Sequence, residues 1–131
     1  MSKKIETEFI GSVHKYLPPT FYRVKHFNPY SGGMADCWYS GVKDLWIEYK
    51  YVLIPKREGT YIVPDLSELQ KDWLNGRRSE GRNVLVIVGS KNGGVVLRDS
   101  RLWEEGLSAA AFVSQLKTRK ELADFIVREC S

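Results

Sequence analysis

Two helix-like segments are visible in the spacing of apolar residues along the chain. Between Ile5 and Leu17, apolar side chains recur four positions apart, the spacing that aligns them on one face of a helix. Residues 66–80 carry a second stripe of leucine and tryptophan side chains. Residues 5–17 and 66–80 are therefore predicted to be amphipathic helices, and the tail from about residue 101 is also predicted to be helical.

Five other segments have the aromatic and β-branched composition of β-strands. They comprise residues 21–27, 35–40, 44–54, 83–90 and 93–99. The second and third are separated by a short turn and are predicted to form a β-hairpin. The fourth, NVLVIVGS, is a continuous apolar run, which is typical of a strand covered on both faces. The segments 28–33 and 55–65 contain the glycine and proline residues of loops.

The order of these elements is α-β-β-β-α-β-β-α, which predicts an α/β fold with a mixed central sheet flanked by helices. The helix at 66–80 is the expected crossover between the hairpin and the apolar strand. A length of 131 residues suits one domain, with a core over about 5–98 and a C-terminal helical extension over about 100–131. In that extension, Thr118 and Glu121 have the spacing of a helix capping box.

The segment DLWIEYKYVLI at 44–54 holds two opposite charges, Glu48 and Lys50, within an otherwise apolar strand. Alternation along the strand places both side chains on one face, together with Trp46 and Val52. The simplest interpretation is an ion pair on a solvated surface. The apolar neighbours instead indicate partial burial, where a charge is costly unless it is paired or bound to a metal ion.

Asp36 supplies a second acidic side chain to the same region. It opens the preceding hairpin strand, so it is expected to lie beside the middle of the charged strand and to converge with Glu48. Two carboxylates and one ammonium group suit Mg²⁺, with Mn²⁺ as the expected substitute. Lys50 would then orient or deprotonate an attacking water, or neutralise charge that develops on a phosphate.

The spacing from Asp36 to Glu48 and Lys50, together with the αβββαβ order, resembles the core of PD-(D/E)XK nucleases. Within that superfamily the segments GGMADCWYSGVKDLWIEYK and LSELQKDWL are most similar to VRR-NUC domains and Holliday junction resolvases. The resemblance covers about residues 5–90 and implies a restriction-endonuclease-like fold and metal-dependent hydrolysis of phosphodiester bonds. Ala35 stands where the family usually has proline, a departure that concerns how the strand begins rather than the chemistry.

The resemblance also implies roles for individual residues. The implied catalytic set is Asp36, Glu48, Lys50 and Gln70. Gln70 occupies the glutamine position of LSELQKDWL and would help to hold the attacking water or the substrate. The metal ligands would be Asp36, Glu48 and an acidic residue of the first helix. Glu6 matches that residue best, because the apolar residues after it fall at the family's offsets, and Glu8 is the alternative.

The chain carries a net charge of +4 and has a pI near 9.1, a basic excess compatible with a polyanionic partner. Basic residues in or beside the predicted core are candidates for contacts with DNA phosphates, which would give salt-sensitive binding independent of sequence. These candidates are Lys25, Lys56, Arg57, Arg77 and Arg78. The tyrosines and tryptophans near them could stack on unpaired bases, although core packing is the commoner role.

The two cysteines, Cys37 and Cys130, lie far apart and form no CxxC pair, so the sequence predicts neither a zinc site nor a disulfide framework. The N-terminal segment MSKKIETEF has no apolar signal region, and no apolar run is long enough to span a membrane. A reducing cytoplasm is the expected compartment, which would be the host cytoplasm for a phage-encoded protein.

These observations predict a Mg²⁺-dependent DNA endonuclease that recognises branched DNA, as Holliday junction resolvases do. One alternative is a nicking or sequence-specific endonuclease of the same fold. Another is a non-catalytic nucleic-acid-binding module in which the Glu48–Lys50 pair is structural. A resolvase must cut two strands and would need a homodimer, and the apolar segments AAAFV and FIV of the C-terminal helices are candidates for its interface.

Overall fold

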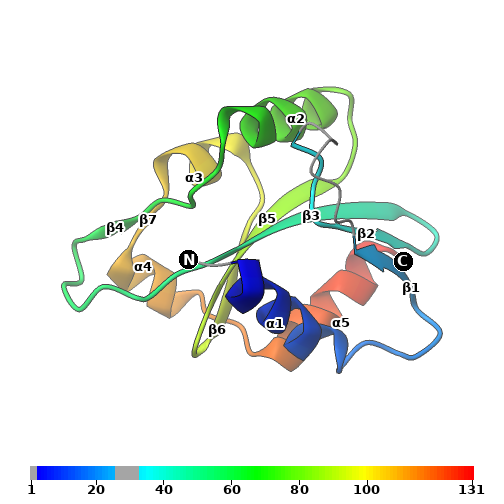
Figure 1. Cartoon of the computed structure of the whole chain (residues 1–131), viewed down its shortest axis with the longest axis horizontal. Helices are drawn as coiled ribbons and strands as arrows, with labels where there is room; N and C mark the ends of the chain where they lie inside the picture. The colour runs from blue at the N-terminus through cyan, green and yellow to red at the C-terminus, as the bar shows by residue number, and fades with distance from the viewer. Residues whose placement is uncertain (1–2, 26–32) are drawn as a thin grey trace.

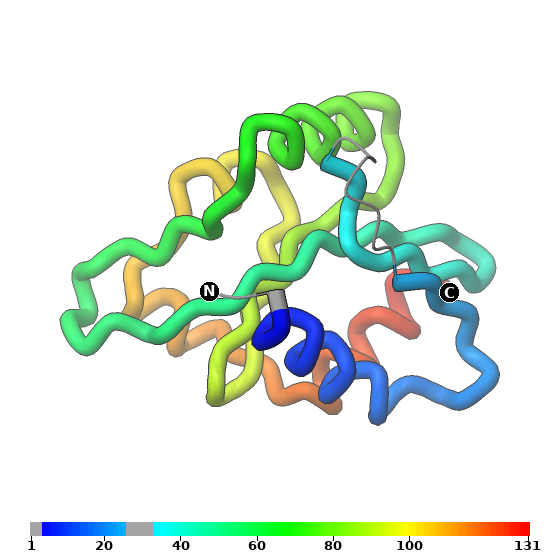
Figure 2. Tube along the Cα trace, in the orientation of Figure 1, coloured from blue at the N-terminus to red at the C-terminus, as the bar shows by residue number. Residues whose placement is uncertain are grey.

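The computed structural model describes residues 3–25 and 33–131, which form a five-stranded sheet with helices on both faces (Figures 1 and 2). The strands of this sheet are β1 (Tyr22–Lys25), β2 (Cys37–Ser40), β3 (Asp44–Tyr51), β5 (Val84–Ser90) and β6 (Gly93–Leu97). The helices are α1 (Lys3–His14), α2 (Glu68–Ser79), α3 (Ser100–Glu105), α4 (Ala109–Ser114) and α5 (Arg119–Glu129). The predicted loop at 28–33 lies outside the described residues apart from Gly33, as do the last two residues of the predicted strand 21–27.

The strand order is β1-β2-β3-β5-β6, and the sheet is mixed. Three neighbouring pairs are antiparallel, whereas β3 and β5 run parallel. The helix α2 lies between these two parallel strands in the chain, as expected for a crossover. All seven residues of β5 are buried, in agreement with its continuous apolar sequence. The predicted αβββαβ core with a mixed central sheet is confirmed.

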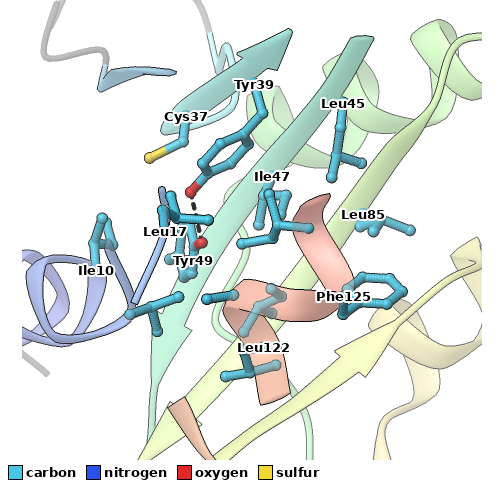
Figure 3. Close-up of a cluster of buried hydrophobic side chains, with 14 of the residues drawn as sticks. Ile10, Leu17, Cys37, Tyr39, Leu45, Ile47, Tyr49, Leu85, Leu122 and Phe125 are labelled. Atoms are coloured by element: carbon cyan, nitrogen blue, oxygen red, sulfur yellow. Dashed lines mark hydrogen bonds between the residues drawn. The ribbon is translucent and has the colours of Figure 1, made fainter. Parts of the chain in front are cut away.

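One face of the sheet is covered by α1 and α5, whose apolar side chains meet those of the central strands (Figure 3). Ile10 and Val13 of α1 belong to the same buried cluster as Ile47 of β3 and Leu122 of α5. The spacing of four that marks the first helix in the sequence thus corresponds to its inward face. The helix α5 completes the core on this side.

The segments expected to form a dimer interface are largely internal. Phe125 and Ile126 of FIV are 6% and 0% exposed, and Phe112 of AAAFV is 1% exposed. Only Val113 of these large apolar side chains is substantially exposed. The apolar residues of these helices stabilise the protomer itself, so this part of the sequence-based hypothesis is wrong.

The other face of the sheet packs against α2, α3 and α4. Leu74 of α2, Trp103 of α3 and Phe112 of α4 join Val86 of β5 in a second buried cluster. The two clusters lie on opposite sides of the central strands, which accounts for the burial of β5 on both faces. Within the described part of the chain, no helix has the length and apolar character needed to cross a membrane.

A small antiparallel sheet interrupts two regions that the sequence analysis treated as loop and helix. It pairs β4 (Tyr61–Ile62) with β7 (Leu107–Ser108). Gly106, just before β7, has a φ of 80° and touches β4 so closely that a Cβ would collide with the Ile62 carbonyl oxygen. The predicted helical tail is present as three short helices, and β7 separates the first of them, α3, from α4.

Candidate active site

Glu48 lies in the middle of β3, on the face that packs against α2. The side chains of β3 alternate as predicted: Ile47 and Tyr49 join the cluster beneath α1, while Trp46 packs on the opposite side. Only 2% of Glu48 is exposed, and the side chain of Lys50 is 15% exposed. The pair is therefore not on a solvated surface, and the burial inferred from the neighbouring residues is confirmed.

Asp36 lies beside Glu48 across the β2–β3 hairpin. The register pairs Cys37 with Ile47, so the preceding residue of β2 faces Glu48. The carboxylate of Asp36 accepts a hydrogen bond of 2.9 Å from the backbone N–H of Tyr49. This bond fixes the position of Asp36 on the strand that carries Glu48 and Lys50.

The electrostatic surroundings of Glu48 favour its protonated form. Burial raises its pKa to about 9, and the charge of Asp36 adds to this shift. The ammonium group of Lys50, whose Nζ is 3.7 Å from Glu48 Oε2, opposes the shift without cancelling it. The charge of Glu6 raises the pKa of Glu48 further. A nearby cation would reverse this balance and favour the carboxylate.

Gln70 connects the start of α2 to Glu48. The side-chain oxygen of Gln70 accepts a hydrogen bond of 3.0 Å from the backbone N–H of Ser67. The backbone N–H of Gln70 donates to the Ser67 hydroxyl at 3.1 Å. These two bonds form a capping box. Because the amide oxygen is used by the cap, the amide nitrogen points to Glu48 Oε2 and donates to it at 3.1 Å. Gln70 therefore lies beside Asp36 and Glu48, at the position predicted from the sequence.

One oxygen of Glu48 is buried without a hydrogen-bond partner among the described residues. Gln70 and Lys50 both approach Oε2, whereas Oε1 has no such partner there. A buried oxygen of this kind is costly unless something binds it. When Glu48 is ionised, this oxygen and the Asp36 carboxylate make a hard, anionic donor set that fits Mg²⁺. Within residues 3–25 and 33–131, no three histidine, cysteine or acidic side chains gather closely enough to hold a metal ion by themselves.

Glu6 is placed in the first turn of α1 and is partly buried. Its charge contributes to the raised pKa of Glu48, so the two carboxyl groups are electrostatically coupled. Glu8, the alternative acidic residue, is exposed. The placement favours Glu6 over Glu8 as the acidic residue of the first helix, and its role as a metal ligand stays a prediction.

Three of the predicted DNA-contacting residues have exposed side chains. Lys25 ends the edge strand β1, and Lys56 and Arg57 lie in the loop that follows β3. Their positions leave the cationic groups accessible to a phosphate backbone.

The other two candidates, Arg77 and Arg78, lie at the C-terminal end of α2, away from Gln70. Arg77 forms an ion pair of 2.8 Å with Glu80. Arg78 donates a hydrogen bond to the carbonyl oxygen of Arg98. Both guanidinium groups therefore have intramolecular partners, and their contact with DNA stays a prediction.

The sequence analysis missed the part played by Ser67. The hydroxyl of Ser67 caps α2 and helps to orient Gln70. The spacing Ser-x-x-Gln immediately before an apolar helix is the sequence pattern of a capping box and would have indicated this.

Comparison with known proteins gives a likeness in structure rather than in sequence. No family model and no curated protein matches the chain. The fold matches Hjc of Archaeoglobus fulgidus, a Holliday junction resolvase from an archaeal hyperthermophile, over 98% of this chain and 99% of that chain, with a TM-score of 0.59 and 14% sequence identity. The chain has the fold of this resolvase. This likeness shows the fold alone, and that fold agrees with the αβββαβ core expected from the sequence.

Proposed function

We propose that this protein is a divalent-metal-dependent DNA endonuclease that selects branched DNA, as a Holliday junction resolvase does. The observation that carries the proposal is the gathering of Asp36, Glu48, Lys50 and Gln70 in a fold like that of Hjc. Paired carboxylates beside a lysine suit the hydrolysis of a phosphodiester bond, because they can hold a cation while the ammonium group faces the phosphate.

In this proposal Asp36 and Glu48 hold Mg²⁺, with Glu6 assisting from α1. The bound cation would supply Lewis acidity toward the phosphate and would lower the pKa of water. Lys50 donates hydrogen bonds to a phosphate oxygen or to the attacking water, which limits the directions from which that water can approach phosphorus. Gln70 holds Glu48 Oε2 in place, so that the carboxylate does not rotate during the reaction.

Branched DNA is the proposed substrate because the fold is that of a junction resolvase. The exposed Lys25, Lys56 and Arg57 would contact phosphates of the DNA arms without reading their sequence. Two symmetric cuts would require two copies of the chain. Since the apolar residues of α5 are internal, the interface of such a dimer would involve other surfaces.

The test is a cleavage assay of the purified protein with Mg²⁺ or Mn²⁺ on four-way junction, flap, single-stranded and duplex DNA. We expect cleavage of the junction, and loss of cleavage by at least about a hundredfold in Glu48→Gln and Lys50→Ala. The first change removes a proposed ligand of the cation, and the second removes the ammonium group that faces the phosphate. Junction binding by these variants should persist.

A matched control is Glu105→Gln, which makes the same chemical change on the exposed surface of α3. It should leave cleavage unchanged. Cleavage that survives Asp36→Asn combined with Glu48→Gln would show that the site is misassigned. Binding to DNA without cleavage of any substrate would favour a non-catalytic binding module, and cleavage of duplex alone would favour a sequence-specific or nicking enzyme.

A further inference from the structure

A row of four aromatic side chains crosses the face of the sheet that carries Glu48. It consists of Tyr22 (β1), Trp38 (β2), Trp46 (β3) and Trp73 (α2). The ring centroids of Tyr22 and Trp38 are 5.4 Å apart, those of Trp38 and Trp46 are 5.6 Å apart, and those of Trp46 and Trp73 are 5.6 Å apart. The planes of Trp38 and Trp46 differ by only 14°. Tyr22 meets Trp38 edge-on at 74°, and Trp73 meets Trp46 edge-on at 66°. The four rings therefore form one continuous chain of ring contacts, which we call the aromatic row.

The aromatic row begins beside the candidate active site. Trp46 lies two residues before Glu48 on the same face of β3, a distance of about 7 Å along the strand. Trp73 follows Gln70 by three residues and so lies on the same side of α2. From this point the row leads away from the site across β2 to the edge strand β1.

The far end of the row is not absorbed into the hydrophobic core. Trp46 and Trp73 pack against the buried cluster beneath α2, but among the described residues that cluster takes no member from β1 or β2. Tyr22 is 54% exposed. The indole N–H of Trp38 is buried and has no acceptor in the part of the chain that the structure describes. Core packing alone accounts for neither the exposed ring nor the unpaired donor.

We infer that the aromatic row binds unpaired nucleobases of the DNA strand that passes through the active site. The inference rests on the proposed nuclease function. A base in a duplex has both faces covered by its neighbours, so only an unpaired base can stack on a protein ring. Stacking of a base on the exposed ring of Tyr22, at the outer end of the row, would hold the unpaired strand against the sheet on its way to the phosphate at Glu48. Movement of the Tyr22 ring onto that base would uncover the Trp38 N–H, so that a base carbonyl or phosphate oxygen could accept from it.

The test measures binding of the whole protein, without divalent cation, to two labelled duplexes with a short single-stranded bulge. In one duplex the bulge carries bases, and in the other it consists of abasic residues. We expect the protein to bind the base-containing bulge about tenfold more tightly. Tyr22→Ala should remove most of this preference, Tyr22→Phe should keep it, and Trp38→Phe should reduce it by removing the N–H while retaining a ring.

Tyr16→Ala is the matched control, because Tyr16 is 53% exposed and lies outside the aromatic row. It should leave the preference intact. Equal binding of the two bulges by the unmodified protein, or an unchanged preference in Tyr22→Ala, would overturn the inference even if the protein cleaves junctions. A preference for the base-containing bulge in a protein that cleaves nothing would support base stacking and reject only the nuclease proposal.

Discussion

Glu48 is the residue at which burial and chemistry conflict most directly. It is 2% exposed, and its Oε1 has no hydrogen-bond partner among the described residues. Burial and the charge of Asp36 outweigh the attraction of Lys50, so the pKa of Glu48 is about 9. A buried carboxyl group with a raised pKa destabilises the folded state at a pH where it would otherwise be ionised. Such groups are retained where function requires them.

This conflict predicts how stability depends on pH in the absence of divalent cations. The folded protein holds the Glu48 proton up to about pH 9, whereas the unfolded chain releases it near the ordinary pKa of 4.5. The free energy of unfolding should therefore fall as pH rises between these two values. Glu48→Gln should remove this loss and be more stable than the parent by about 1–2 kcal/mol at pH 8.

Urea denaturation at a series of pH values, with a chelator present, measures this difference. The two proteins should converge near pH 4, where Glu48 is protonated in both the folded and the unfolded state. Glu105→Gln, on the exposed surface, provides the comparison and should follow the parent. Parallel curves for the parent and Glu48→Gln would contradict the raised pKa.

At the scale of elements, the start of α2 couples helix formation to the site. Ser67 and Gln70 form the capping box, and the same Gln70 amide donates to Glu48. Losing the Ser67 hydroxyl would expose the helix N-terminus and allow Gln70 to turn away. Ser67 is thus a positioning residue that acts through Gln70.

Ser67→Ala should lower the free energy of unfolding by about 1 kcal/mol, the usual effect of losing an N-cap, and should also slow cleavage severalfold. Thr118→Ala is a matched control, because Thr118 and Glu121 form the same capping box on α5. It should cost similar stability without changing the cleavage rate. Rescue of cleavage by Ser67→Thr would support positioning, and equal cleavage rates for both alanine variants would argue against it.

Much of this element-level arrangement could be predicted from the sequence. Period-two alternation in β3 was sufficient to place Glu48 and Lys50 on one face, because one side of that strand is strongly apolar. The pairing of β4 with β7 could not be predicted, since two-residue strands carry almost no periodicity. The contact of Gln70 with Glu48 depends on how α2 packs on the sheet, and local sequence does not specify such packing.

At the scale of the whole molecule, contacts between the first helix, α1, and the last helix, α5, join the two ends of the described chain. The Arg119 Nε donates to the Ser12 hydroxyl at 2.8 Å, and its guanidinium group lies 5.0 Å from the ring centroid of Phe9. Leu122 and Ile126 of α5 belong to the same buried cluster as the inward side chains of α1 and of the central strands. The C-terminal helix is therefore part of the core that supports the candidate active site.

Ile126→Ala should lower the free energy of unfolding by about 2–5 kcal/mol, because it leaves a cavity at a fully buried position. Val113→Ala, at a position that is 51% exposed, should change it by less than about 1 kcal/mol. Chemical denaturation at several protein concentrations measures both values. A small effect of Ile126→Ala, or a loss that disappears at high protein concentration, would indicate that α5 forms an interface instead.

The partnership of α1 with α5 also has a consequence for biosynthesis. A ribosome makes α1 first, but the helix that packs beside it does not exist until residues 119–129 have been translated. Until then the apolar underside of the nascent sheet lacks its cover and is open to chaperones and proteases. Because Arg119 and Ser12 are 107 residues apart, this closure joins distant parts of the chain and is expected to be a late step in folding. The fold, and with it any activity of the candidate active site, is therefore expected to be complete only after translation has passed α5.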